Sequence, residues 1–286
     1  FEIDTNAGAI AIQGAIGETT ALTSLTINSD GAGTIEVANI GDSSGVGVSG
    51  ATAIGNTSTT TLTLDGTVYK TTGAQVYTAT GGDNIDITNT SNAAFTTTNT
   101  AITFGTANIE LANGVDLTLD SGAGAGAITL VAIDGHSSEA VTIDAGTGAT
   151  SVGAIGAGTE IGAVTIGSSD NGTITLNGAI TTTGAVNLDG PVSLATGAIT
   201  VDSSAGDAAI NFLHTIDGAQ NLTLSSGSGA VDINGIIGST TAIGTLTVNA
   251  SGTGTIAIEQ IGDGDPASGS LGATIGVPKI FAISIP

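Results

Sequence analysis

Short runs in which apolar and polar residues alternate recur along the whole chain. Seventeen triplets read apolar–polar–apolar, such as LTI at 25–27, LTL at 62–64, VTI at 141–143 and LTV at 246–248. Alternation with a period of two is typical of a β-strand with one buried face. Most triplets are followed within a few residues by Gly, Asn, Asp or Ser, which accept the backbone conformations of tight turns. The pattern therefore predicts many short strands joined by tight corners.

One longer pattern occurs three times. Residues 14–42 match residues 235–263 at 16 of 29 positions, and a looser version begins at Gly153. The matched positions are turn glycines and apolar strand positions, whereas polar positions vary. A duplicated active site would show the reverse, so the repeat indicates repeated packing. The related copies cover about residues 3–42, 141–180 and 222–263.

Two all-β architectures fit many short strands, namely a parallel β-helix (β-solenoid) and tandem antiparallel β-sandwiches. The 46 glycines would each cost a helix about 1 kcal/mol relative to alanine, so helices are disfavoured. The chain has 2 Tyr, 5 Phe and no Trp, whereas a sandwich core is usually anchored by such residues. Asn-Gly hairpin turns are also few. We therefore expect one β-solenoid over residues 1–286 with Gly, Asn and Asp corners, and keep the sandwiches as the alternative.

Some segments lack the regular pattern and are rich in Ser, Thr, Gly and Asn. We expect them to bulge from the coil as loop insertions or small extra strands. The stretch TVYKTTGAQVYTATGG, at 67–82, could form a protruding hairpin. The expected insertions cover about residues 43–60, 65–83, 88–100 and 263–279.

The composition restricts the partners. The chain has no Arg, only two Lys and 25 acids, for a formal net charge of −23. Such a surface repels nucleic acid and anionic membranes, because phosphate binding needs clustered Lys or Arg. No apolar run reaches the roughly 18 to 20 residues of a membrane-spanning helix, so we expect no membrane insertion. The absence of Cys fits an extracellular protein without disulfides.

Few residues could carry chemistry, and we expect no catalytic residues. His136 and His214 are the only histidines, and both lie in loop-like contexts. Acid pairs such as Asp116 and Asp120 could serve in glycoside hydrolysis, which needs two carboxylates at a set separation. However, arginines that could bind a sugar substrate are absent. The sequence therefore favours a protein that is not an enzyme.

Calcium is the one cofactor that the sequence suggests. The stretch GDGDPASG, at 262–269, places Asp263 and Asp265 two residues apart on a glycine-rich turn, and Ca²⁺ prefers oxygen ligands of this kind. The stretch does not match the 12-residue loop of a helix–loop–helix calcium site. It also does not match the glycine-rich nonapeptide of a calcium roll. An ordinary acidic turn is the alternative interpretation.

The repeated stretches of the chain resemble those of a known protein family. The stretch TIDGAQNLTLSSGSGAVDINGIIGSTTAIGTLTVNASGTGTI, at 215–256, is similar to the repeats of filamentous-haemagglutinin-like adhesins and their β-strand-repeat relatives. The first and middle copies carry the same likeness, which therefore covers most of the chain. It implies a right-handed parallel β-helix, export to the bacterial cell surface, and a structural or adhesive role with a host or surface glycan as partner.

Both ends of the chain lack an obvious polar cap. The segment VPKIFAISIP, at 277–286, is an apolar alternating strand. An unpaired strand edge recruits another strand, and end-to-end contacts that do not close produce a filament. We therefore expect the shaft or subunit of an extracellular β-solenoid fibre, assembled from identical subunits through end-to-end contacts or strand addition. The expected contact residues are Phe1, Ile3, Ile280, Phe281, Ile283 and Ile285.

Two other functions fit a β-solenoid. A β-helical carbohydrate-active or spike protein would need clustered acids in a groove on one face. An ice-binding solenoid would need a pair of threonines on each coil in fixed register. The observed triplets usually place an apolar residue where the second threonine would stand.

Overall fold

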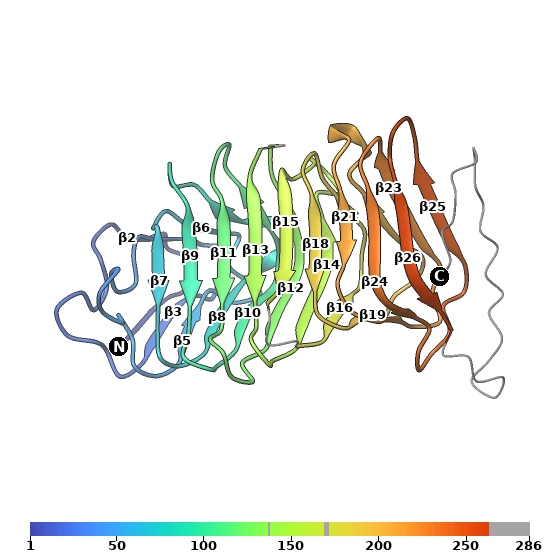
Figure 1. Cartoon of the computed structure of the whole chain (residues 1–286). Helices are drawn as coiled ribbons and strands as arrows, with labels where there is room; N and C mark the ends of the chain where they lie inside the picture. The colour runs from blue at the N-terminus through green and yellow to red at the C-terminus, as the bar shows by residue number, and fades with distance from the viewer. Residues whose placement is uncertain (137, 169–171, 263–286) are drawn as a thin grey trace.

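The computed structural model describes residues 1–136, 138–168 and 172–262. The described chain is a parallel β-solenoid of about 11 turns, whose axis runs from the N-terminal end at the left of Figure 1 to β25 and β26 at the right. All strand pairings between the described strands are parallel, and each strand pairs with the strands one turn before and one turn after it. The predicted parallel β-helix is therefore confirmed, and the alternative of antiparallel sandwiches is wrong.

Each turn passes along three faces, which we number in chain order. The first two turns reach face 3 only through isolated bridges, such as those at Ile16 and Ile40. Face 1 contains β1 (Glu2–Thr5), β3 (Leu25–Ser29), β5 (Thr52–Ile54), the first parts of β8 (Gln75–Ile87), β10 (Ile102–Leu111), β12 (Ile128–Asp134) and β14 (Thr150–Ile155), then β16 (Ile174–Leu176), β19 (Val192–Leu194), β22 (Ile216–Asp217), and the ends of β24 (Val231–Ile237) and β26 (Ile256–Ile261).

Face 2 follows face 1 in every turn. It contains β2 (Ile10–Ile12), β4 (Thr34–Val37), β6 (Thr61–Leu64), the last parts of β8, β10, β12 and β14, then β17 (Ile180–Thr181), β20 (Ile199–Asp202), β23 (Leu222–Gly227) and β25 (Leu246–Ala250). A single 3₁₀ turn, η1 (Ser204–Gly206), follows β20.

Face 3 completes each turn and forms the front row of strands in Figure 1. It contains β7 (Val68–Lys70), β9 (Ala93–Thr96), β11 (Leu117–Asp120), β13 (Ala140–Asp144), β15 (Ala163–Gly167), β18 (Val186–Asp189), β21 (Ile210–Phe212), and the first parts of β24 and β26.

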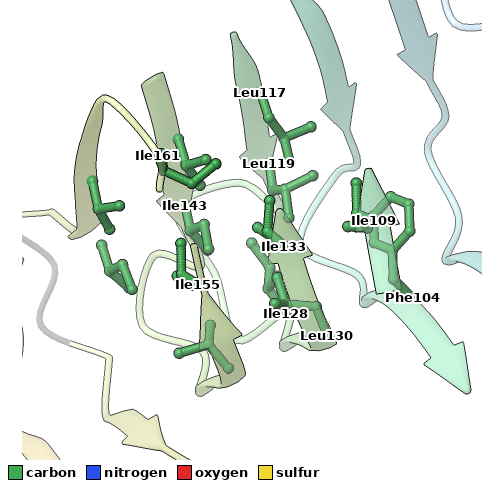
Figure 2. Close-up of a cluster of buried hydrophobic side chains, with 14 of the residues drawn as sticks. Phe104, Ile109, Leu117, Leu119, Ile128, Leu130, Ile133, Ile143, Ile155 and Ile161 are labelled. Carbon is green, nitrogen blue, oxygen red and sulfur yellow. The ribbon is translucent and has the colours of Figure 1, made fainter. Parts of the chain in front are cut away.

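The core is a column of aliphatic side chains enclosed by the three faces. Figure 2 shows side chains such as Leu119, Ile133 and Ile155 projecting inward from different strands and lying in successive layers. In a typical strand such as β3, Leu25 and Ile27 point inward and are at most 1% exposed, and Thr26 between them points outward. All seventeen predicted triplets lie within strands, because the period-two pattern directly encodes which side chains are buried.

The expected loop insertions are wrong over the described residues. Segments 43–60, 65–83 and 88–100 contain β5, β7, the start of β8 and β9, all of which are regular rungs of the solenoid. The hairpin expected at 67–82 is wrong too, because β7 and β8 lie on different faces and pair with other turns. In β5 and β8 the alternation of apolar and polar residues is hidden, because the polar Thr52 and Gln75 occupy inward positions. The fourth segment, 263–279, lies outside the described residues.

Gln75 can be buried because its polar atoms are bonded. Its Nε2 donates to the carbonyl oxygens of Tyr69, at 2.8 Å, and Thr96, at 2.9 Å, and its Oε1 accepts a bond of 3.0 Å from the hydroxyl of Tyr77. A buried amide without these partners would cost several kcal/mol. The network therefore lets a polar residue stand in the core.

Most of the aromatic residues gather inside these same turns. Tyr69 stacks on Phe95 with ring centroids 4.4 Å apart, and Tyr77 stacks on Phe104 at 4.9 Å. The two stacks meet edge to face, at 5.3 Å between Tyr77 and Phe95. All four side chains are fully buried. These four aromatics thus anchor the core locally, and apart from Phe212 the rest of the described core is aliphatic.

The three sequence copies occupy different faces. The first strand-forming leucine or valine of the pattern is Leu25 on face 1, Val164 on face 3 and Leu246 on face 2. The chain still visits the faces in the same cyclic order in every copy. The repeated pattern therefore encodes a strand and its corner, and it can form on any of the three faces.

One corner in each copy requires glycine. Gly17, Gly156 and Gly238 follow the matched isoleucines and have φ values of +71°, +69° and +73°. This left-handed region is costly for residues with a Cβ. The repeated Ile-Gly step is thus a buried side chain followed by a left-handed corner.

Candidate functional surfaces

The N-terminal end of the solenoid presents open core. Among the described residues, β1 pairs only with β3 and β2 pairs only with β4, so the outer edge of this rung is unpaired. Phe1 is 61% exposed, and Ile3 and Ile12 are half-buried. They border a shallow apolar depression of about 410 Å³, which Ile16 and Leu22 also line. One turn further, the partners of Ile3 and the inward residues of β4 are fully buried, so another rung stacked on this end would cover these side chains.

The expected end-contact residues are placed only in part. Phe1 and Ile3 line the depression described above, and their role as end contacts stays a prediction. The other four, Ile280, Phe281, Ile283 and Ile285, lie outside the described residues, as do the candidate calcium ligands Asp263 and Asp265. Within residues 1–136, 138–168 and 172–262, no group of three or more His, Asp or Glu side chains could hold a metal ion.

The histidines are far apart in the fold and each has a local partner. His136 Nδ1 lies 3.0 Å from the carbonyl oxygen of Leu111, and His214 Nε2 lies 3.0 Å from Asp189 Oδ1. Both contacts join neighbouring turns. The ring nitrogens thus help to tie successive corners together.

The carboxylates considered for catalysis hold corners. Asp116 accepts the N–H of Ala140 at 2.7 Å, and Asp120 accepts the N–H of Gly122 at 2.7 Å. Side-chain oxygens that accept local backbone N–H groups are typical of tight turns. The same role explains the recurrence of Asp after strands along this chain.

The most deeply buried carboxylate of the described residues, Glu139, was not predicted from the sequence. Its side chain is fully buried at the corner before β13. It accepts the N–H of Gly114 at 2.8 Å from the preceding turn, and the N–H of His136 at 2.6 Å and the hydroxyl of Ser138 at 3.0 Å from its own corner. Burial by itself raises the pKa of Glu139, but these hydrogen bonds outweigh it and hold the pKa at about 2. Glu139 therefore fastens two turns together.

Glu139→Gln should lower the free energy of unfolding by about 2 kcal/mol at pH 7, because the amide cannot replace the bonds of both carboxylate oxygens. The folded pKa lies below the ordinary value of 4.5. The carboxylate's contribution is therefore complete above pH 4.5 and is lost as the pH falls toward 2. Urea denaturation of both proteins at several pH values should show the difference shrinking over that interval.

The exposed Glu18→Gln is the control for removing one acid. It should change the free energy of unfolding by less than about 0.5 kcal/mol at every pH. A constant difference between wild type and Glu139→Gln from pH 7 to pH 2.5 would contradict the role assigned to the carboxylate.

Charge is distributed unevenly over the three faces. On face 2, stacked outward positions carry Glu36, Asp86, Glu110 and Asp134, with Thr63 between the first two. On face 3, acids stand at the ends of three strands, at Asp120, Asp144 and Asp189. Face 1 differs, because its outward positions from β3 to β19 carry no charged side chain. The solenoid therefore has two acidic faces and one neutral face.

Comparison with models of protein families, with curated proteins and with solved structures finds no match to this chain. A parallel β-solenoid is consistent with β-helical repeat adhesins. No helix among the described residues has the length and apolar character needed to cross a membrane.

Proposed function

We propose that this chain is a non-enzymatic shaft segment of an extracellular or bacterial cell-surface fibre, of the kind formed by filamentous-haemagglutinin-like adhesins. The observation that carries the proposal is the parallel ladder from β1 to β26, which makes a rod. The hydrogen bonds of a parallel solenoid run along its axis. An axial pull loads the bonds of three strands together at each rung, so the rod resists extension.

The proposal includes end-to-end assembly at the outer edge of the first described rung. The edge of β1 and β2 offers unpaired N–H and C=O groups together with the half-buried Ile3 and Ile12. A terminal strand of a second copy would satisfy these groups and bury the isoleucines, which is strand addition. Contacts of this head-to-tail kind do not close, so they extend into a filament. In this proposal the corners along the rod bind the adhesion ligand, which is a host or surface glycan.

The proposal predicts that the purified chain forms rods longer than one solenoid at high protein concentration. Ile12→Asp should abolish them, because a carboxylate would enter the stacking surface without a partner. The matched control is Ala11→Asp, which adds the same charge on the exposed side of the same strand. Negative-stain electron microscopy gives the length distribution. Equal shortening by both variants, or a wild type that stays one solenoid long, would overturn end-to-end assembly.

A further inference from the structure

Face 1 carries a continuous neutral surface that the shaft itself does not use. We define the neutral face by its central outward column, in which each residue is the register partner of the next: Thr26, Ala53, Val76, Thr103, Thr129, Ser151, Thr175 and Ser193. Charged residues bound this column at both ends, with Glu2 before it and Asp217 after it. Eight successive rungs are therefore neutral on a chain of net charge −23.

A second column beside the first consists of alanines. These residues precede the strands of five successive rungs, and the carbonyl oxygen of each accepts the N–H of the strand before it, so they continue the ladder: Ala51, Ala74, Ala101, Ala127 and Ala149. The neutral face also carries two of the four exposed large hydrophobic side chains of the described chain, Val76 at 38% and Val131 at 42%. Methyl groups and short hydroxyl side chains thus cover a sheet of regular register.

We infer that the neutral face is a lateral interface at which a second copy of this chain packs, neutral face against neutral face. Small side chains let two sheets approach closely over their whole length, as in stacked sheets generally. Two copies that met through face 2 or face 3 would bring columns of acids together, and like charges repel. The same patch on both partners gives a two-fold dimer that closes.

The size of the neutral face fits a weak dimer. Eight rungs spaced by about 4.8 Å, with three outward positions along each strand, give a surface of roughly 35 by 14 Å. Two copies would bury roughly 1,000 to 1,200 Å² in total, the lower end of the range for specific interfaces. The neutral face has no protruding aromatic anchor, because Tyr77 and Phe104 on its rungs are fully buried. The dimer should therefore depend on protein concentration and tighten as salt screens the acids of the two copies.

Two other occupants fit less well. Binding a flat neutral polysaccharide usually uses exposed aromatic rings, and the stacked rings of this chain lie in the core. Ice binding would need paired threonines on each rung. The neutral face instead places alanine beside the central threonine or serine on rungs such as those of Thr103, Thr129 and Ser151.

The test compares two variants that each add two negative charges at outward positions two rungs apart. Val76→Glu/Thr129→Glu changes the neutral face, and Thr118→Glu/Thr165→Glu changes the matching column of face 3. Both variants and their parent also carry Ile12→Asp, which blocks end-to-end assembly. Sedimentation equilibrium from about 10 to 500 μM should show a dimer for this parent and for the face 3 variant. The neutral-face variant should be monomeric, with its dimer constant weakened at least tenfold. Far-UV circular dichroism and thermal melting check that both variants are folded.

Small-angle scattering distinguishes this interface from end-to-end assembly. A lateral dimer doubles the mass and thickens the cross-section without adding length, whereas end-to-end stacking doubles the length. Ile12→Asp should leave the lateral dimer intact, so failure of the shaft proposal and failure of this one are separable. Three results would overturn the inference: a monomeric Ile12→Asp parent throughout, equal loss of dimer in both charge variants, or a monomer that shapes ice crystals through its neutral face.

Discussion

Replacing Phe95 by alanine should lower the free energy of unfolding by about 3 to 5 kcal/mol, the usual cost of removing a buried phenylalanine. The side chain is fully buried, lies parallel to Tyr69 at a centroid distance of 4.4 Å, and meets Phe104 edge to face at 5.2 Å. Each aromatic pair contributes roughly 0.5 to 1.5 kcal/mol beyond its buried area. The change should therefore be among the most damaging single substitutions in the chain.

Phe212→Ala is the matched control. Phe212 is also fully buried on face 3, but its register partners are the aliphatic Leu188 and Ile233. Urea denaturation of the two variants should show that Phe95→Ala costs at least 1 kcal/mol more. Near-ultraviolet circular dichroism should lose its tyrosine signal only in Phe95→Ala. Equal costs would mean that the ring geometry adds nothing to the burial of the side chain.

Replacing Gly156 by alanine should lower the free energy of unfolding by about 2 to 4 kcal/mol, which is the second large effect that we expect. Its φ of +69° disfavours any side chain, and an added Cβ would stand 2.1 Å from the carbonyl oxygen of Thr181 in the next turn. A left-handed conformation costs an ordinary residue roughly 1 to 2 kcal/mol. The contact between the added Cβ and the carbonyl oxygen of Thr181 must also be relieved. Moving one rung away from the next would do this at a further cost in stability. Thermal and urea unfolding measure the sum.

Two other glycines separate the two contributions. Gly197 has a φ of +66° with nothing within 4 Å of an added Cβ, so Gly197→Ala should show the conformational cost alone, about 1 kcal/mol. Gly14 has neither a positive φ nor a close neighbour, and Gly14→Ala should be neutral within about 0.5 kcal/mol. The explanation would fail if Gly156→Ala were no worse than Gly197→Ala.

The strands and their inward side chains could be predicted, because burial in a β-strand follows the alternation of neighbouring residues. The triplets LTI at 25–27 and VTI at 141–143 became the strands β3 and β13, with their apolar residues in the core. The pattern failed at Thr52 and Gln75, where polar residues point inward. At Gln75 the polar atoms are bonded to partners that include the Thr96 carbonyl of another turn, whereas the buried Thr52 hydroxyl has no hydrogen-bond partner.

The candidate surfaces were predicted less well. The apolar residues Phe1 and Ile3 line a depression at the first rung, and the end-to-end contacts expected of them stay a prediction. The neutral face and the corner fastened by Glu139 were not expected, because each depends on which residues stand above one another. That spacing varies: 18 residues separate the partners Ile174 and Val192, but 29 separate Ile40 and Tyr69.

The sequence by itself determined that this chain forms short strands with aliphatic inward faces, joined by left-handed glycine corners, and that its surface is strongly acidic. These properties depend on residues close together in the chain. Only the tertiary structure decided that Leu25, Val164 and Leu246 stand on three different faces, and that the acids are kept off one of them. The physical reason is that the number of residues in each turn sets the register of the next rung, and the hydrogen bonds of the parallel ladder fix that register.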